Sequence, residues 1–131
     1  MMNITNYKKP ESAIPSTEKE IKTEQGNNNA MKALEIYEKV FAEIIKREGA
    51  AELFEYLKNE TDFFTAPAST NFHSNFKGGL ASHSVQVYKN LRRIMNTNWM
   101  KEMFGIDPSE ETMAIVALLH DICKVNNYIY K

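Results

Sequence analysis

The segment Met113–Cys123 constrains the fold most, because it is apolar on nearly every face until the pair His120 and Asp121 interrupts it. A helix that is apolar all round has to be surrounded by other elements. Residues 107–110 (DPSE) come just before it and supply a capping Asp, a proline for the first helical position and a Glu that closes a capping box. We therefore predict a buried helix in the C-terminal part of the chain.

Amphipathic patterns earlier in the chain predict the helices that surround this buried helix. Apolar residues recur at steps of three and four from Ala30, which predicts a helix that ends near Gly49, followed by a shorter helix to about Asn59. Between residues 60 and 79, four phenylalanines together with Pro and Gly predict an aromatic-rich loop packed on the domain. A second helical stripe and a short helical turn follow; their apolar-face residues are Leu80, His83, Val87, Leu91 and Ile94, then Trp99, Met100, Met103 and Phe104. With no alternating strand pattern, the predicted class is all-α.

The chain has 131 residues, which predicts a single domain. Residues 1–29 contain no Leu, Val, Phe or Trp, so they bury too little apolar surface to offset their chain entropy. We predict that residues 1–29 are a disordered polar tail, with a tether for a partner as the alternative, and that residues 30–131 form the helical domain.

Charge and cysteine content exclude several classes of function. A net charge of -1 gives no bulk attraction to nucleic acid or to anionic lipid. No apolar run approaches the ~20 residues that span a bilayer, and no signal peptide is evident, so we expect a cytoplasmic protein without a membrane partner. The single Cys123 excludes an internal disulfide and a four-cysteine zinc cage, and we expect it to pack in the interior.

Three side chains form a candidate metal site. On a helix His120 and Asp121 lie about 100° apart, so both reach one ion only if the helix passes beside it and a third ligand comes from another helix. His83, on the inward stripe, is that third ligand. A buried carboxylate without a counter-charge costs several kcal/mol, which a divalent cation would remove. The alternative is that His83 is a hydrogen-bonded core histidine and that Asp121 lies at the surface near a helix end.

Residues 117–124 (ALLHDICK), preceded by residues 78–83 (GGLASH), resemble the HD-domain metal-dependent phosphohydrolase superfamily in order and spacing. Residues 64–73 are similar to the lead-in of HD proteins related to a bacterial 3′-to-5′ exoribonuclease and of phage-type HD hydrolases. The resemblance covers roughly residues 60–131 and implies an HD-like helical bundle.

The resemblance also implies a chemistry. His83, His120 and Asp121 would bind a divalent ion (Mn, Mg, Fe or Zn) that activates water for hydrolysis of a phosphomonoester or phosphodiester, in a nucleotide or a related small molecule. Lys124 would neutralise the substrate phosphate, or it is an exposed lysine at a helix end. His73 would bind a second ion, protonate the leaving oxygen, or simply pack. A nucleic-acid substrate is not favoured, because the chain is nearly neutral.

Members of this superfamily close the site with one more Asp on a later helix, and no Asp follows Asp121 in this sequence. The resemblance therefore implies the N-terminal part of an HD domain, incomplete at the C-terminus, whose exposed apolar surface would favour association into a homo-oligomer. Two alternatives stay open: a naturally short protein whose site is completed by water or by another chain, and a non-catalytic ligand-binding or interaction module derived from an HD domain.

Overall fold

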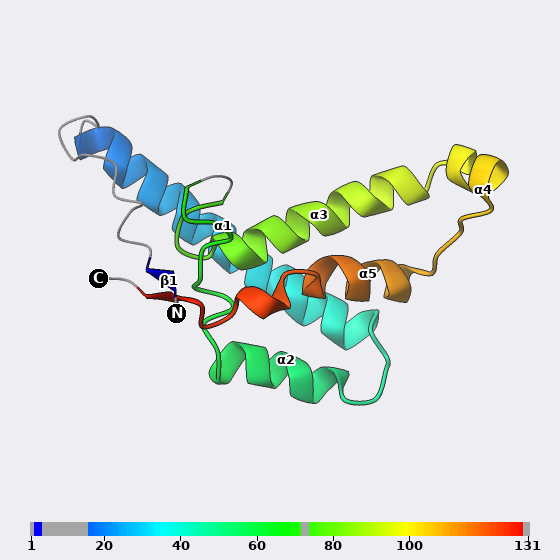
Figure 1. Cartoon of the computed structure of the whole chain (residues 1–131), viewed down its shortest axis with the longest axis horizontal. Helices are drawn as coiled ribbons and strands as arrows, with labels where there is room; N and C mark the ends of the chain where they lie inside the picture. Colours follow the sequence, from blue (N-terminus) through cyan, green and yellow to red (C-terminus); the bar gives the residue numbers. More distant parts are fainter. Residues whose placement is uncertain (1, 4–15, 72–73, 130–131) are drawn as a thin grey trace.

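A computed structural model describes residues 2–3, 16–71 and 74–129, and the side chains of residues 28–71 and 74–128 (Figure 1). The predicted all-α class is confirmed. In this part of the chain the helices are α1 (Ser16–Glu43), α2 (Ala50–Asn59), α3 (Gly79–Met95), α4 (Asn98–Phe104), α5 (Glu110–Leu119) and the 3₁₀ helix η3 (Ile122–Lys124). Two strands of two residues each, β1 (Met2–Asn3) and β2 (Tyr128–Ile129), pair in parallel.

The first helix is longer at its N-terminal end than the sequence predicted. It begins at Ser16 instead of Ala30 and ends at Glu43, while Gly49 is the N-cap of α2. Extending a helix that is already anchored by packing costs little, and the Glu, Lys and Gln residues of this stretch are good helix formers. Residues 16–29 are thus helical where a disordered tail was expected. The division into a tail and a domain stays a prediction, because residues 1 and 4–15 lie outside the described residues.

The core lies between α1, α3 and α5. α3 packs against both α5 and α1, and α2 contacts α1 (Figure 1). The side chains that fill this space are fully or almost fully buried; the largest apolar ones are Tyr37, Leu57, Phe63, Leu80 and Leu118. Removing such side chains from water is the main favourable contribution to folding.

The loop between α2 and α3 packs on the core, as predicted. Phe63 is fully buried, and its ring and that of Phe64 make edge-to-face contacts with the ring of Tyr37. Two glycines let the loop approach closely: Gly78 has a φ of +83° and a Cβ there would overlap Ala30, whereas a Cβ on Gly79 would overlap the backbone of Ser74. The start of α3 is therefore fixed by close backbone contacts.

The last α-helix begins and ends at residues other than those predicted. Its N-cap is Ser109, whose side-chain oxygen accepts a hydrogen bond from the backbone N–H of Thr112 at 3.1 Å, so Asp107 is not the cap. The helix ends at Leu119, before the His–Asp pair.

The far end of α3 is built differently. α4 was predicted as a short helical turn before Gly105, and it projects from the end of α3 away from α1 and α2 (Figure 1). None of its residues is buried, and Trp99, Met103 and Phe104 are each more than half exposed. Among the described residues, no helix is both long and apolar enough to cross a membrane.

Candidate metal centre

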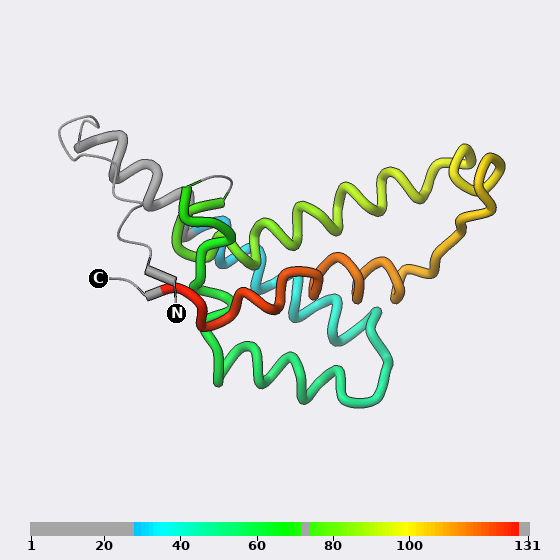
Figure 2. Tube along the Cα trace, viewed as in Figure 1, coloured from blue at the N-terminus to red at the C-terminus, as the bar shows by residue number. Residues whose placement is uncertain are grey.

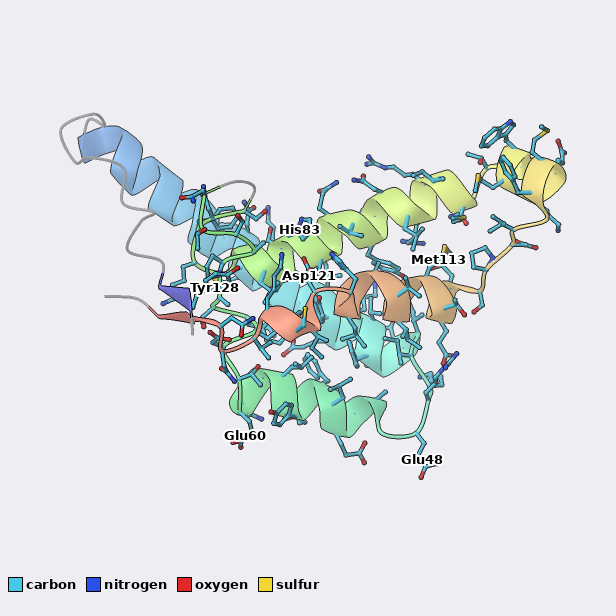
Figure 3. All side chains as sticks on the ribbon, in the orientation of Figure 1. Glu48, Glu60, His83, Met113, Asp121 and Tyr128 are labelled. Atoms are coloured by element: carbon cyan, nitrogen blue, oxygen red, sulfur yellow. The ribbon has the colours of Figure 1, made fainter. Side chains whose placement is uncertain are left out.

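The three predicted donor side chains come together between α3 and the C-terminal end of α5. One ligand atom from each of His83, His120 and Asp121 lies within 4.8 Å of the other two. Asp121 Oδ2 is 3.6 Å from His83 Nε2 and 3.3 Å from His120 Nε2, and the two imidazole ring centroids are 5.3 Å apart. Figure 3 labels His83 and Asp121, which lie close together where α3 passes the end of α5.

The end of α5 places His120 and Asp121. The prediction that both lie on one continuous helix is wrong: His120 is the C-cap, and Asp121 leaves the helix with φ -108° and ψ 18°. The helix ends here because its last carbonyl groups have partners other than the next turn. Tyr37 Oη donates a 2.6 Å hydrogen bond to the Leu118 carbonyl, and His120 Nδ1 lies 2.7 Å from the Ala117 carbonyl.

Tyr37 lies in the core and holds the C-terminal end of α5 through its hydrogen bond to the Leu118 carbonyl. It is fully buried, and burial raises the pKa of its phenol well above the ordinary value, so the group remains a hydrogen-bond donor. Tyr37 belongs to the apolar stripe that begins at Ala30, and that stripe was interpreted only as the packing face of a helix. The signal that was missed is a hydroxyl in the middle of a stripe of Leu, Phe and Ile, because such a hydroxyl needs a buried partner.

The contact with Ala117 fixes the protonation pattern of His120. A carbonyl oxygen only accepts, so Nδ1 has to carry the hydrogen, which leaves Nε2 as the atom that faces Asp121. A neutral imidazole would direct the lone pair of Nε2 toward a carboxylate oxygen 3.3 Å away, which is repulsive. A cation beside these atoms would relieve this repulsion.

A resident cation also contacts the carboxylate. Lys124 Nζ lies 3.1 Å from Asp121 Oδ2 and donates a 2.9 Å hydrogen bond to the Ala68 carbonyl of the α2–α3 loop. Lys124 thus supplies the counter-charge that the sequence analysis assigned to a metal alone, so burial of Asp121 does not by itself require an ion. Burial is also incomplete: the side chains of His83, His120 and Asp121 are 22%, 32% and 17% exposed. The site opens to solvent at the edge of the core.

The segment after the site is joined to the loop after α2. Asp62 Oδ1 accepts a 2.6 Å hydrogen bond from the backbone N–H of Asn126, whose φ is +58°, and the Asp62 N–H donates to Asn126 Oδ1 at 3.3 Å. Figure 2 shows this segment passing beside the α2–α3 loop. Contacts at Ala68 and Asp62 therefore hold the site from the loop side.

The donor set fits a divalent transition metal. Ligand atoms about 2.1 Å from one ion at octahedral or tetrahedral angles lie roughly 3.0 to 3.4 Å apart. The separations of 3.3 and 3.6 Å around Asp121 Oδ2 are close to this range, and the ligand nitrogens of the two histidines lie within 4.8 Å of each other. Two imidazoles and one carboxylate leave positions for water or substrate, as catalytic sites do.

Two other residues singled out from the sequence have different outcomes. His73 lies outside the described residues, so its proposed role stays a prediction. Cys123 was expected to pack in the interior, but it is exposed. The reason is the early end of α5, since Cys123 belongs to η3 and not to the buried helix.

Comparison with known proteins gives one relationship. No family model matches the chain, and no solved structure matches it significantly. A stretch of 66 residues is 38% identical to dihydroneopterin 2',3'-cyclic phosphate phosphodiesterase from Methanocaldococcus jannaschii. The match covers 50% of this chain and 26% of the relative, so the chain spans about a quarter of that protein's length. Over half its length, the chain is therefore distantly related to a phosphodiesterase.

Proposed function

We propose that this chain forms the metal-binding part of an HD-type phosphohydrolase that hydrolyses a phosphate ester. The observation that carries the proposal is the convergence of His83, His120 and Asp121, whose donor atoms lie within 4.8 Å of one another. The relationship to a phosphodiesterase supports a phosphoryl substrate. Among the esters, it favours a phosphodiester over a phosphomonoester.

Each side chain has a defined task. The two Nε2 atoms and Asp121 Oδ2 would hold the ion, and the carbonyl of Ala117 keeps the His120 ring turned toward it. A bound divalent ion lowers the pKa of water and polarises a phosphoryl oxygen. Two imidazole ligands favour Mn²⁺, Fe²⁺ or Zn²⁺ over Mg²⁺, which prefers oxygen ligands.

The proposed substrate is a small nucleotide or a related phosphodiester. The name of the relative points to a cyclic phosphate, a strained diester of this class. The near-neutral net charge does not favour a long nucleic acid. His73 remains the candidate for a second metal ligand or a proton donor.

One observation favours a second function, a non-catalytic ligand-binding module. Lys124 already neutralises Asp121 at 3.1 Å, so the cluster is electrostatically complete without a metal ion. In that case the site would bind a ligand through its hydrogen-bonding groups and no bond would be cleaved.

Metal reconstitution followed by activity assays separates the two functions. The purified chain is loaded with Mn²⁺, Fe²⁺ or Zn²⁺ and assayed on a 2',3'-cyclic nucleotide and on bis(p-nitrophenyl) phosphate. We expect hydrolysis of the diesters that Asp121→Ala abolishes and that the matched control Asp107→Ala retains, since Asp107 is an exposed carboxylate that pairs with Lys101 of α4. Metal binding without hydrolysis would favour the module; absence of metal binding would refute the metal site and would also favour the module.

A further inference from the structure

Three nitrogen atoms converge on a single carboxylate oxygen. Asp121 Oδ2 is approached by His120 Nε2 at 3.3 Å, by His83 Nε2 at 3.6 Å and by Lys124 Nζ at 3.1 Å, so the ammonium is the nearest of the three. An oxygen that accepts a hydrogen bond from an ammonium has less electron density and less space to offer a metal ion. The atom that would ligate the metal is therefore already engaged.

Lys124 is held in this position from both sides. Its ammonium donates to Ala68 O at 2.9 Å and its side chain is 28% exposed, so it is not an extended surface lysine. The loop carbonyl belongs to Ala68, which is itself buried. The ammonium is thus anchored beside the carboxylate by a buried part of the fold.

We infer that Lys124 is an internal counter-ion that competes with the divalent metal for Asp121 Oδ2 and thereby lowers the affinity of the site. This inference rests on the proposed function, because it assumes that the three donors bind a metal. When the metal enters, the ammonium leaves Oδ2, since two positive charges on one oxygen repel each other. The Ala68 carbonyl keeps the ammonium at the edge of the site.

Competition and a positioning role predict opposite effects of replacing Lys124 on the affinity for the metal ion. If Lys124 merely positioned Asp121, its replacement would weaken metal binding. If it competes, Lys124→Met tightens binding, because the replacement removes the charge and keeps a side chain of similar length. A neighbouring charge changes an ionic equilibrium by about one to three powers of ten, so we expect the dissociation constant for Mn²⁺ to fall at least about tenfold.

The experiment is calorimetric titration of Mn²⁺ into the full chain at one fixed pH, compared with the Mn²⁺-induced rise in melting temperature. Lys124→Arg, which keeps the charge, should retain the wild-type affinity. The matched control is Lys101→Met, which removes the same charge from an exposed pair with Asp107 and should leave the affinity unchanged. Lys124→Gln provides a second neutral variant if Lys124→Met does not fold.

The outcomes separate the inference from the proposed function. Tighter binding in the neutral Lys124 variants alone supports the competition. Equal or weaker binding in these variants, with wild-type binding that depends on Asp121, overturns the competition and leaves the proposed function standing. If the wild-type chain binds no Mn²⁺, or if Asp121→Ala binds it equally well, both are overturned.

Discussion

The two ends of α3 differ in almost every physical respect. At the N-terminal end Gly79, Leu80 and Ser84 are completely or almost completely buried, and His83 faces Asp121 (Figure 3). At the C-terminal end Ile94 is 53% exposed, and α4 follows without a single buried residue. One helix thus carries a candidate site at the end where the fold is packed and an exposed apolar surface at the other.

The kind of polar contact differs as well. At the packed end, backbone carbonyls hold the side chains: Ala117 holds His120, Leu118 holds Tyr37 and Ala68 holds Lys124. At the far end, the Thr97 hydroxyl donates only to the Ile94 carbonyl three residues earlier, and the contacts that join different segments are exposed ion pairs, Arg92 with Glu110 and Lys101 with Asp107. Backbone partners are fixed by the fold, whereas exposed ion pairs contribute about 0 to 1 kcal/mol and lose entropy when they form. The difference teaches that side-chain donors are held at defined positions where backbone carbonyls of the packed fold accept their hydrogen bonds.

The largest effect is expected from shortening apolar side chains at the two ends of α3. Leu80→Ala should lower the free energy of unfolding by about 3 kcal/mol, because Leu80 is fully buried and a cavity would remain. Ile94→Ala, at the exposed end, should change it by less than about 1 kcal/mol. Urea unfolding followed by circular dichroism measures both. Equal losses would show that the two ends are packed alike.

An intermediate effect is expected from the hydroxyl of Tyr37. Tyr37→Phe leaves the buried Leu118 carbonyl without its donor and should cost about 1 to 3 kcal/mol. The matched control Tyr56→Phe alters an exposed side chain and should change stability very little. Chemical unfolding of both variants tests the contact, and a neutral Tyr37→Phe would mean that the end of α5 does not depend on it.

The same tyrosine predicts a dependence on alkaline pH. Burial raises the pKa of Tyr37 in the folded chain, so its contribution to stability is complete below the ordinary value of 10.0 and is lost as the pH rises above it. The wild-type chain should therefore lose more stability than Tyr37→Phe between pH 9 and about 11. Melting temperatures over this range provide the measurement, and parallel losses in the two proteins would contradict it.

The smallest effect is expected at the far end. Lys101→Ala breaks the ion pair with Asp107, whose side chains are 66% and 64% exposed, and should change the free energy of unfolding by less than about 0.5 kcal/mol. Unfolding at low and at high salt checks this. A loss above 1 kcal/mol that vanished in salt would show that the far end is stabilised electrostatically after all.

Much of the architecture could be predicted because periodicity reports burial. The stripe that contains Leu80 and Val87 predicted α3, and Gly105 marked the end of α4. The same reasoning selected His83, His120 and Asp121, since polar groups within apolar patterns indicate a shared partner. Their spatial convergence followed from the packing of α3 against α5.

Other features depend on contacts between distant segments and leave no local pattern. The end of α5 at Leu119 is set partly by a hydroxyl 81 positions away, so apolar periodicity through Ile122 predicted too long a helix. The contact of Lys124 with Ala68 spans 56 positions, and neither spacing nor the resemblance indicated it or the contact with Asp121. The start of α1 at Ser16 was not predicted. The prediction used the composition of residues 1–29, which indicates how much apolar surface they can bury but not that they continue a packed helix.

The central claim is that His83 and His120, from two separate elements, bind one metal ion together with Asp121. X-ray absorption spectroscopy of the Zn²⁺-loaded chain tests it most directly, because it counts imidazole ligands at about 2.0 to 2.1 Å. We predict that the imidazole count falls by one in His83→Ala and by one in His120→Ala. An imidazole count that is unchanged in His83→Ala would contradict the account.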